Sequence, residues 1–587
     1  MKELLIKILF SAFALLLSFI FKIDIVKKIL LILPIIVLLE NDIREAIKKI
    51  KKKNIFNEYT FIILSSILLI ISLKLTILLE ALLFFSLKDY LYYKLVEPNK
   101  EKIISSIRKD TEKVLLKTPS GLMQVPLKET KVGDIIYLEK GKINQAEGIL
   151  LSENNSYVTL FTKKEIKVET DDYIPSGVVL LNDALIKIKR NYQTSSYYKM
   201  GNLLEQLEDK DTEKTLRLER RINKLLYVIS IGIIALIYKD VKEIIPIVAS
   251  IIFLIEMESL KRIETMILFK YIYRVLKEDI FISKESLLED ILKIKNIVFS
   301  KEGVVTNKLE LAKIVPVYQT KEEILEKAVY AEEGSTHPYA KALRNYKKID
   351  IEEDKIYFKE EIKGKGVRAI IDGEEIYVGS NILFDELNIT YPKIDFQMPT
   401  CLIAINKTYA GTFVFSTSIK EDIYLTSSLL REEGIERIVL ISSSEKEQIK
   451  KIGSRLSMNE SYASLTLEEK GKVLDMYKKE AKTLYVDAYD LNQTLRENSD
   501  ITVMLGSNKE IDQADIILPT TDINDIVKFI KIAKKRKKNQ KFLRIASLII
   551  KVLLLGLILF NLCDIAVSAF IYLLIFFIEV LTFYFNI

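Results

Sequence analysis

The chain has 587 residues, of which 49% are hydrophobic and 28% are charged. Long apolar runs must therefore be segregated from highly charged stretches, which is typical of a membrane protein that carries large soluble parts. The formal net charge of +7 is small for this length and excludes a nucleic-acid-binding surface. The two cysteines, Cys401 and Cys563, lie far apart in the sequence, which excludes a Cys-x-x-Cys metal site and indicates a reducing environment.

Hydrophobic stretches occur in four pairs, which predicts eight membrane-spanning helices arranged as hairpins. The pairs cover residues 4–21 and 29–39, 61–73 and 75–92, 225–238 and 244–268, and 543–560 and 565–585. No small-residue cleavage site follows the first stretch, so we expect an uncleaved anchor. A basic cluster at residues 44–53 follows the first pair, where it sets topology or lies on anionic headgroups. We expect a multi-pass protein of the plasma membrane whose soluble parts are cytoplasmic.

Between the second and third pairs, short alternating runs and turn residues predict a compact β-rich domain. One of its runs, at residues 132–141, reads Val-Gly-Asp-Ile-Ile-Tyr-Leu-Glu-Lys-Gly. Further on, the domain contains Thr162-Lys163-Lys164. Taken alone, the two lysines indicate a solvated loop.

The second helix of the third pair carries two ionisable residues, Glu256 and Glu258. Such groups are costly in hydrocarbon, so both are candidate ligands of a transported ion. Both also lie toward the cytoplasmic side, next to Lys261 and Arg262, where snorkelling to water is a sufficient explanation.

The soluble part at residues 271–541 alternates helical patterns with short apolar strands, as doubly wound α/β domains do. Within it, residues 296–306 read Asn-Ile-Val-Phe-Ser-Lys-Glu-Gly-Val-Val-Thr. An apolar, β-branched run that breaks into a glycine-containing turn predicts a buried strand. That strand delivers Ser300 to its carboxyl end.

This segment resembles the signature of the P-type ATPases, a strand followed by Asp-Lys-Thr-Gly-Thr-Leu-Thr, in which ATP phosphorylates the Asp. Lys301, Gly303 and Thr306 match the signature, whereas Ser300 stands in place of the acceptor. In the family, the carboxylate attacks the γ-phosphoryl group and forms an acyl phosphate near a magnesium ion. A serine hydroxyl cannot form that intermediate. The resemblance therefore implies the architecture of a transport ATPase without its central reaction.

The resemblance extends to segments that precede this one in the sequence. Residues 132–141 resemble the opening of the family's actuator domain, and Thr162-Lys163-Lys164 stands where the family has Thr-Gly-Glu. The glutamate of that motif orients the hydrolytic water, which lysines cannot do. Met257-Glu258-Ser259 stands where the heavy-metal branch carries Cys-Pro-Cys, but it has neither cysteine nor proline.

Residues 332–341 resemble the Ser-Glu-His-Pro-Leu-Ala-Lys motif of the heavy-metal branch, with His337 at the adenine-contacting histidine. Glu332 matches a glutamate five residues ahead of that histidine, and Gly364 and Gly366 match a Gly-x-Gly strand pair. The resemblance implies an adenine site made of these four residues. Alternatively, the glycines only form a hairpin and Pro338 only starts a helix.

The remaining motifs of the family's phosphorylation domain can be located in the sequence, but several of their acidic residues are missing. The segment ending at Lys470 resembles Pro-Glu-Asp-Lys and retains the phosphate-contacting lysine. Residues 442–444, all serine, replace Thr-Gly-Asp. Asp487 matches the first magnesium-binding carboxylate, and Leu491 stands where the second would be. Asp490 would take the place of this second carboxylate only if the match to the family motif is shifted by one residue.

The predicted architecture is an α-helical membrane domain of eight helices, a cytoplasmic β-rich actuator-like domain and an α/β HAD-like phosphorylation domain with an inserted nucleotide-binding domain. The membrane part is predicted at residues 1–96, 221–270 and 542–587, the actuator-like part at 97–220, the phosphorylation-type part at 271–307 and 418–541, and the nucleotide-binding-like part at 308–417.

The pattern of substitutions predicts a degenerate heavy-metal P-type ATPase that has lost acyl-phosphate chemistry. It is expected to bind ATP, to need little magnesium, and to act as a regulatory or partner subunit of an intact transporter or another membrane protein in the bilayer. One alternative is an active metal-cation-transporting ATPase that phosphorylates another carboxylate. Glu302 is the nearest candidate, but we expect it to face away from the strand end. A structural membrane scaffold is the other alternative.

Overall fold

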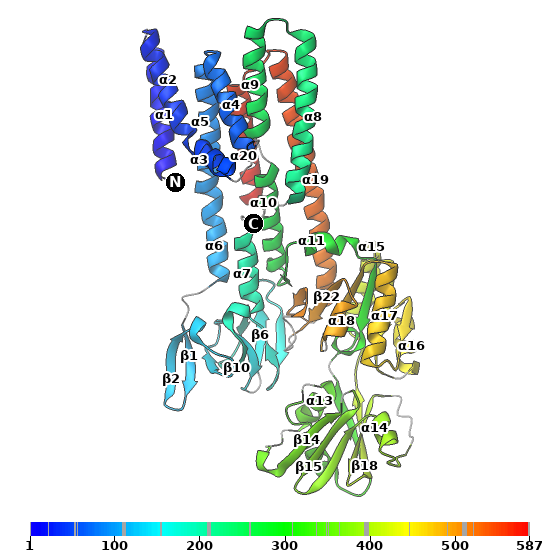
Figure 1. Cartoon of the computed structure of the whole chain (residues 1–587). Helices are drawn as coiled ribbons and strands as arrows, with labels where there is room; N and C mark the ends of the chain where they lie inside the picture. The colour runs from blue at the N-terminus through cyan, green and yellow to red at the C-terminus, as the bar shows by residue number, and fades with distance from the viewer. Residues whose placement is uncertain are drawn as a thin grey trace. The chain divides into compact units, whose positions relative to one another are not determined.

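The computed structural model describes residues 2–584, except 22, 52–54, 56, 109–112, 153–154, 208–212, 258–259, 308, 336, 348, 350, 363, 393–397, 445, 490, 507–512 and 521. The chain forms two compact units, each assembled from separate segments (Figure 1). The first comprises Met1–Lys109, Gly201–Arg274 and Lys535–Ile587, and the second comprises Asp110–Met200 and Val275–Lys534.

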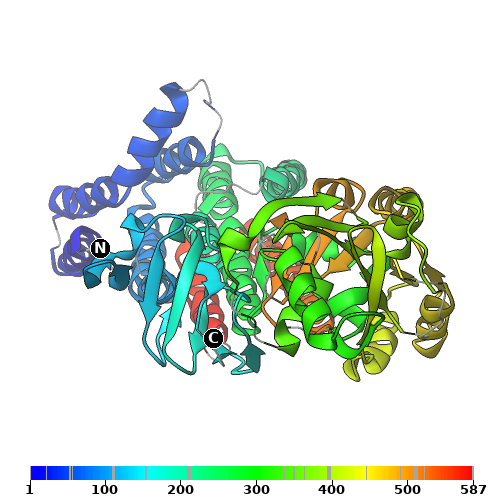
Figure 2. The ribbon, with the colours of Figure 1, turned by 90° about the horizontal axis from the view of Figure 1, so that it is seen from below.

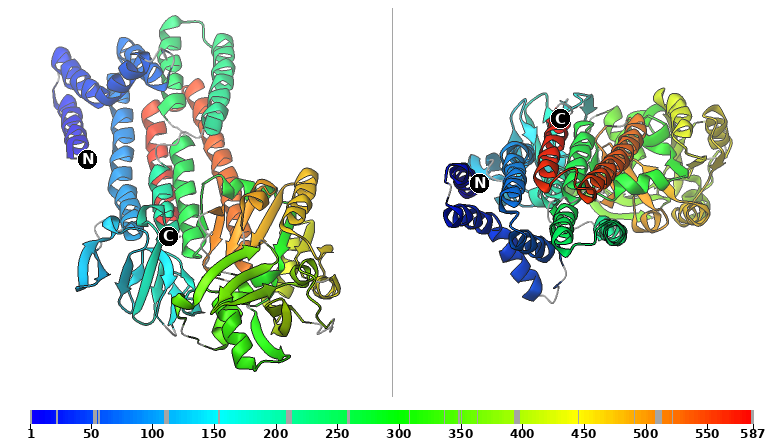
Figure 3. Two further views of the ribbon diagram at one scale, coloured as in Figure 1. Left: turned by 60° about the horizontal axis from the view of Figure 1, so that its bottom comes forward. Right: turned by 90° about the horizontal axis from the view of Figure 1, so that it is seen from above.

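The described residues of the first unit are almost entirely helical (Figure 3). Its helices are α1 (Lys2–Ile20), α2 (Asp24–Leu38), α3 (Glu40–Lys51), α4 (Glu58–Ile71), α5 (Leu75–Leu91), α6 (Glu97–Ile107), α8 (Glu213–Ile237), α9 (Val241–Met257), α10 (Leu260–Lys277), α19 (Asn524–Leu559) and α20 (Ile565–Tyr584), with a π-helical turn at Tyr92–Val96. Helix α7 (Ser196–Gln206), like α10 and α19, has residues in both units. The ring of Phe85 on α5 packs against Phe253 on α9 and Tyr572 on α20, with centroid separations of 5.9 and 6.4 Å.

All eight hydrophobic stretches identified in the sequence fall on helices as far as they are described. Among the described helices, two contain an apolar window long enough to cross a bilayer: α1, with a mean hydropathy of 2.2, and α19, with 2.4. The apolar parts of α4 and α20 are shorter. A helical first unit is therefore observed, and a count of eight spans stays a prediction.

Residues 113–190 in the second unit confirm the predicted β-rich part, which folds into two sheets. One sheet has the order β2-β1-β3-β10-β5-β8 and the other β4-β9-β6-β7. The strands are β1 (Lys113–Thr118), β2 (Gly121–Pro126), β3 (Ile135–Leu138), β4 (Ile143–Asn144), β5 (Glu147–Leu150), β6 (Asn155–Thr159), β7 (Glu165–Val168), β8 (Tyr173–Ile174), β9 (Val178–Leu180) and β10 (Ala184–Arg190). Alternate residues such as Ile186 and Ile188 are fully buried, as expected for strands with one face on a core.

The second part of this unit is a seven-stranded sheet with the order β11-β23-β22-β21-β12-β19-β20. All neighbouring strands are parallel except β11 and β23. The strands are β11 (Phe281–Ile282), β12 (Asn296–Ser300), β19 (Arg437–Ile441), β20 (Glu460–Tyr462), β21 (Thr483–Asp487), β22 (Ile501–Leu505) and β23 (Ile516–Leu518), and the helices between them are α11 (Leu287–Asp290), α15 (Asp422–Glu432), α16 (Lys446–Arg455), α17 (Leu467–Glu480) and α18 (Gln493–Glu497). Every residue of β12 is buried, as predicted.

A six-stranded antiparallel sheet is inserted between β12 and β19, in the order β13-β18-β17-β16-β15-β14 (Figure 2). Its strands are β13 (Glu310–Pro316), β14 (Ile356–Ile362), β15 (Gly366–Ile371), β16 (Glu374–Gly379), β17 (Thr400–Ile405) and β18 (Thr408–Ser416). Successive strand residues point to opposite faces. Ile376 and Val378 accordingly join the core under α12 (Lys321–Ala331) and α13 (Pro338–Tyr346), whereas Tyr377 joins the core under α14 (Asn381–Glu386).

Candidate functional site

The topology of the parallel sheet brings several of the predicted residues to one edge. The chain passes from β12 to β19 and β20 on one side and then returns to β21 on the other, so β12 and β21 flank the point where the strand order reverses. Ligands of open α/β sheets bind outside the carboxyl ends of the strands at such a point. Ser300 ends β12, Asp487 ends β21, and the serines at 442–444 follow β19.

Glu302 is directed into this edge, so the expectation that it faces away is wrong. Both Ser442 Oγ and Ser444 Oγ donate to Glu302 Oε1 at 3.2 Å. The physical reason lies in the backbone after β12. Glu302 keeps extended dihedral angles there, φ −69° and ψ 125°, and the chain reverses only after it, at Gly303 with φ +71°, a left-handed conformation that glycine adopts without strain.

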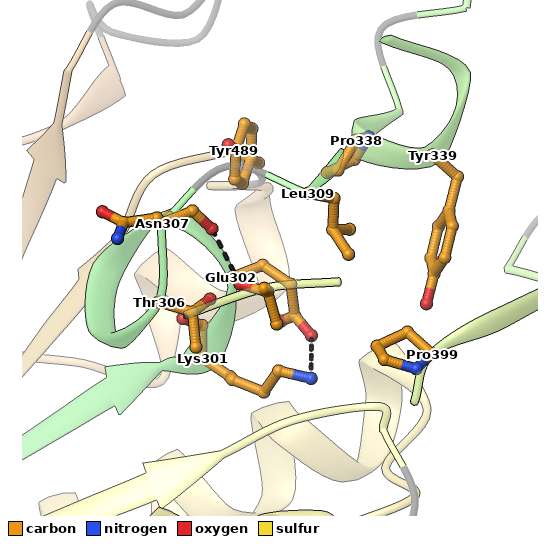
Figure 4. Close-up of a pocket in the computed structure, with 11 residues that line it drawn as sticks. Lys301, Glu302, Thr306, Asn307, Leu309, Pro338, Tyr339, Pro399 and Tyr489 are labelled. Carbon is orange, nitrogen blue, oxygen red and sulfur yellow. Dashed lines mark hydrogen bonds and ion pairs between the residues drawn. The ribbon is translucent and has the colours of Figure 1, made fainter. Parts of the chain in front are cut away.

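Lys301 is almost fully buried and binds the same cluster. Its Nζ donates to Ser444 Oγ at 2.7 Å and to Gln448 Oε1 at 3.0 Å. The same Nζ lies 3.4 Å from Glu302 Oε1 (Figure 4). Burial lowers the pKa of Lys301, against the attraction of Glu302. Burial also opposes ionisation of Glu302, but Lys301, Lys470 and the Ser444 hydroxyl outweigh it and hold the pKa of Glu302 below its usual value.

Lys470, which the family resemblance makes a phosphate-contacting lysine, lies in the first turn of α17. That helix starts with a capping box in which Thr466 and Glu469 satisfy each other's backbone N–H groups. The positive charge of Lys470 helps to lower the pKa of Glu302.

Lys420 is a site residue that the sequence analysis missed. It is 8% exposed, and its Nζ donates to the carbonyl oxygen of Gly303 at 2.6 Å. Burial lowers its pKa to about 8. No local motif marks it, because the bridge between Thr306 and Ile419 that brings it to the turn joins residues far apart in the sequence.

Asp487 is buried, and its two carboxylate oxygens already accept hydrogen bonds from their own strand and turn. Oδ1 accepts from the backbone N–H of Ala488 at 2.6 Å and of Tyr489 at 2.9 Å, and Oδ2 accepts from the Tyr485 hydroxyl. Leu491, in place of the second predicted carboxylate, is fully buried. Asp490, the substitute that a slip would bring in, lies outside the described residues.

The loop at 162–164 is docked onto acidic residues, so its interpretation as a solvated loop is wrong for Lys164. Lys164 Nζ lies 2.5 Å from Asp522 Oδ2 and 3.3 Å from Asp525 Oδ1. The Asp279 carboxylate accepts from the backbone N–H of Thr162 at 2.7 Å. Lys163, at the left-handed position of the turn with φ +55°, is exposed as predicted.

The four predicted adenine-site residues lie on the inserted sheet and its helices. His337 caps α13, because its Nδ1 accepts from the Tyr339 N–H at 3.3 Å, and its exposed ring stacks on that of Tyr339 at 5.3 Å. Gly364 makes a left-handed turn with φ +74°, and a Cβ at Gly366 would lie 2.2 Å from the Val378 carbonyl oxygen. These contacts give the histidine and the glycines roles in the fold, and Pro338 begins α13.

Glu332 differs from the other three residues, because one of its carboxylate oxygens is buried without a hydrogen-bond partner among the described residues. It is 7% exposed, and its Oε2 has no hydrogen-bond partner among the described residues. Burial raises its pKa, against the pull of Ser335 and of Lys359. A buried acceptor without a partner is costly, unless a ligand supplies the donor.

A narrow pocket joins the sheet edge to the start of α13 (Figure 4). Lys301, Glu302 and Tyr489 line it from the parallel sheet, and Pro338 and Tyr339 line it from the inserted domain. It contains about 10 Å³ of free space, enough for a single water molecule. Lys301 and Glu302 therefore belong to its lining, whereas the predicted adenine-site residues Glu332, His337, Gly364 and Gly366 are not among the described residues that line it.

The structure does not describe the side chains of the candidate ion ligands Glu256 and Glu258. Glu256 lies in the last turn of α9, and its side chain is outside the described residues, as is all of Glu258. Within the described ranges, no three His, Cys, Asp or Glu side chains form a group that holds a metal ion.

Comparison with known proteins gives several relatives over most of the chain. The chain is 25% identical over 520 residues to a cadmium, zinc and cobalt-transporting ATPase of Bacillus subtilis, covering 84% of this chain and 73% of that protein. It is 25% identical over 518 residues to a protein of the same description from Helicobacter pylori, covering 84% and 75%. A crystal structure of a zinc-transporting PIB-type ATPase in the E2.Pi state matches with a TM-score of 0.53 and 17% identity over 99% of both chains, which shows a shared fold. No protein-family model matches the chain.

Proposed function

The chain is a heavy-metal P-type ATPase by family, and from that premise we propose that it no longer runs the acyl-phosphate cycle and instead binds an adenine nucleotide as a regulatory or partner subunit. One observation carries this proposal: the residue at the buried carboxyl end of β12 is Ser300. A serine hydroxyl has a much higher pKa than a carboxylate, and its phosphoester lacks the reactivity of an acyl phosphate.

The surroundings support the same conclusion. Lys164 occupies the place of the residue that would orient water, and its ammonium is engaged by Asp522 and Asp525. The residues at the sheet edge do not fit a magnesium ion, which prefers about six oxygen ligands in octahedral geometry. The Asp487 oxygens accept hydrogen bonds from Tyr485, Ala488 and Tyr489, and Leu491 offers no oxygen in its side chain.

The nucleotide site is proposed around Glu332. Its unpartnered, buried Oε2 suits the exocyclic amino group of adenine, which is a hydrogen-bond donor. The exposed ring of His337 offers a face on which the base stacks. Binding at about 0.1 to 1 mM corresponds to about −4 to −5.5 kcal/mol, which a few such contacts supply.

His337→Asn is a sharp test of the nucleotide site, because asparagine also caps a helix but has no ring. In the full chain in lipid nanodiscs, we expect His337→Asn to weaken ATP binding while the melting temperature stays within a few degrees. ATP binding that is equal in the two proteins, or absent from wild type at millimolar ATP, would mean that these residues serve only the fold.

A second candidate function is an active cation-transporting ATPase with Glu302 as the phosphoryl acceptor. It is favoured by the direction of the Glu302 side chain, which points toward Lys301 and Ser444. Labelled ATP decides between the two. We expect no acid-stable, hydroxylamine-sensitive phosphoprotein, whereas a label that disappears in Glu302→Gln would establish the active enzyme.

The membrane arrangement is part of the proposal. Eight spans, cytoplasmic soluble parts and a location in the plasma membrane follow from the four hydrophobic pairs and from the basic residues beside them. The partner would be an intact transporter or another membrane subunit. A purely structural scaffold would bind no nucleotide, so the ATP titration tests that reading too.

A further inference from the structure

We propose that the Glu302 carboxylate permanently occupies an oxyanion subsite at the carboxyl edge of the parallel sheet, and that removing this side chain opens the subsite to a free phosphate-class anion. This inference rests on the proposed loss of the acyl-phosphate cycle and gives it a cause beyond the absence of an acceptor. The subsite is built by Lys301, Ser442 and Ser444, and Lys470 contributes charge to it.

The donors of this subsite are fully used by groups of the chain. A lysine ammonium has three N–H donors. Those of Lys301 have three acceptors around them: Ser444 Oγ at 2.7 Å, Gln448 Oε1 at 3.0 Å and Glu302 Oε1 at 3.4 Å. An incoming anion would therefore have to displace Glu302 from Lys301.

The serine hydroxyls are oriented in the same way. Ser442 Oγ accepts from the Ser444 N–H at 3.0 Å, so its own hydrogen is free to point at Glu302. Ser444 Oγ accepts from Lys301 and donates to Glu302. Each hydroxyl thus receives a hydrogen bond from one side and passes one to the carboxylate, and such chains strengthen one another.

Glu302 is held in place by the backbone as well as by charge. Gly303 packs so closely on Tyr489 and Ala488 that an added Cβ would lie 2.6 Å from the Tyr489 ring and 2.7 Å from the Ala488 Cβ. Lys420 holds the carbonyl oxygen of Gly303 at 2.6 Å. The pocket beside Glu302 retains only about 10 Å³ of free space, too little for a tetrahedral phosphate.

These contacts form an anion-binding site that is occupied by a carboxylate of the chain itself, that of Glu302. One buried amine, Lys301, and the hydroxyls of Ser442 and Ser444 surround a Glu302 oxygen, and Lys470 adds positive charge. Amines and hydroxyls are groups that recognise phosphate. The carboxylate supplies a negative charge at the point where they converge, so a second anion meets both steric exclusion and like-charge repulsion. The chain consequently keeps this edge in an anion-filled arrangement without any phosphoryl transfer.

The experiment measures the binding of inorganic phosphate and of beryllium trifluoride to the full chain in nanodiscs, by melting temperature and by equilibrium dialysis at constant ionic strength. Wild type should show no saturable binding. Glu302→Ala should bind phosphate at least about tenfold more tightly and should melt at a higher temperature as phosphate is added. Glu302→Gln removes the charge but keeps the bulk, so its affinity should fall between the two.

Two further variants locate the effect. Glu432→Ala removes an exposed glutamate on α15 and should behave as wild type. Adding Ser444→Ala to Glu302→Ala should abolish the gain, since it deletes a hydroxyl of the subsite.

The outcomes separate this inference from the proposed function. Phosphate binding to wild type as tight as to Glu302→Ala would overturn the inference, and so would no binding by Glu302→Ala and Glu302→Gln when both retain the wild-type circular dichroism. Neither result depends on adenine binding, which the His337→Asn titration measures. A hydroxylamine-sensitive phosphoprotein formed on Glu302 would overturn both.

Discussion

The ammonium of Lys164 lies 2.5 Å from the Asp522 carboxylate, and this ion pair ties the loop after β6 to the segment that precedes α19. The pair is partly buried and forms part of a network, because Asp525 is also within 3.3 Å of Lys164 and within 2.8 Å of Lys528. The β-rich part and the parallel sheet are therefore linked by charge at a loop where the family resemblance implies a catalytic glutamate.

Replacing Lys164 tests this link. Lys164→Met should destabilise the contact by about 1 to 2 kcal/mol, because it leaves Asp522 and part of Asp525 without a counter-charge in a partly buried place. Hydrogen exchange at residues 159–168 should become faster. Lys163→Met is the matched control, since Lys163 is exposed, and it should leave exchange unchanged. Equal effects of both substitutions would show that the ion pair contributes nothing.

The lowered pKa of Lys420 predicts that the stability of the protein depends on pH. Its pKa in the folded protein is about 8, below the ordinary value of 10.5. Between these values the unfolded chain binds more protons than the folded one, so stability should rise with pH, by at most about 3 kcal/mol from this group. Below pH 8 both states carry the charge and the contribution is constant.

Lys420→Met should remove this contribution. The difference in unfolding free energy between wild type and the variant, measured at pH 8 and again near pH 10, should shift in favour of wild type at the higher pH. Tyrosines that titrate in the same range affect both proteins and cancel in the comparison. A difference that does not change with pH would contradict the assignment.

Gly303→Ala should destabilise the turn that places Glu302. The residue has φ +71°, and the new methyl group would lie 2.6 Å from the Tyr489 ring. Gly373→Ala is the control, because Gly373 has a similar φ of +80° and nothing within 4 Å of the added Cβ. The control should cost about 1 kcal/mol of backbone strain, and Gly303→Ala about 1 to 3 kcal/mol more from the clash. Thermal melting of both variants measures the difference.

Ser300→Asp alone should not restore ATP hydrolysis. The new carboxylate would end β12 two residues before Glu302. Lys164 and Leu491 would still stand where the family resemblance implies a water-orienting glutamate and a second metal-binding carboxylate. ATPase activity in nanodiscs with zinc or cadmium should stay at background. Turnover from this single change would show that the other substitutions are unimportant.

The predicted topology is open to cysteine labelling. In a chain whose two native cysteines are replaced by serine, a cysteine at Lys239, between α8 and α9, should react with an impermeant reagent from outside the cell. A cysteine at Thr336 should react only after the membrane is permeabilised. Reaction at Thr336 in intact cells would mean that the number of spans is wrong.

The sequence alone was enough for the parts of the fold that depend on local patterns. The buried strand at 296–300, the helical character of all eight hydrophobic stretches and the β-rich part follow from periodicity and from turn residues. Ser300 was placed correctly at the carboxyl end of its strand, because a break in an apolar run marks the end of a strand. The family resemblance was likewise confirmed, because it rests on the order and spacing of motifs along the chain.

Only the tertiary structure decided what these residues touch. Glu302 meets Ser442 and Ser444, which lie 140 and 142 residues further along the chain, and Lys164 meets Asp522, which lies 358 residues away. The direction of the Glu302 side chain, just before a left-handed glycine, depends on the turn and on the groups that converge there. Contacts between distant segments leave no periodic trace in sequence, so an ion pair that docks a loop and a carboxylate that fills an anion site both look, along the chain, like ordinary charged residues.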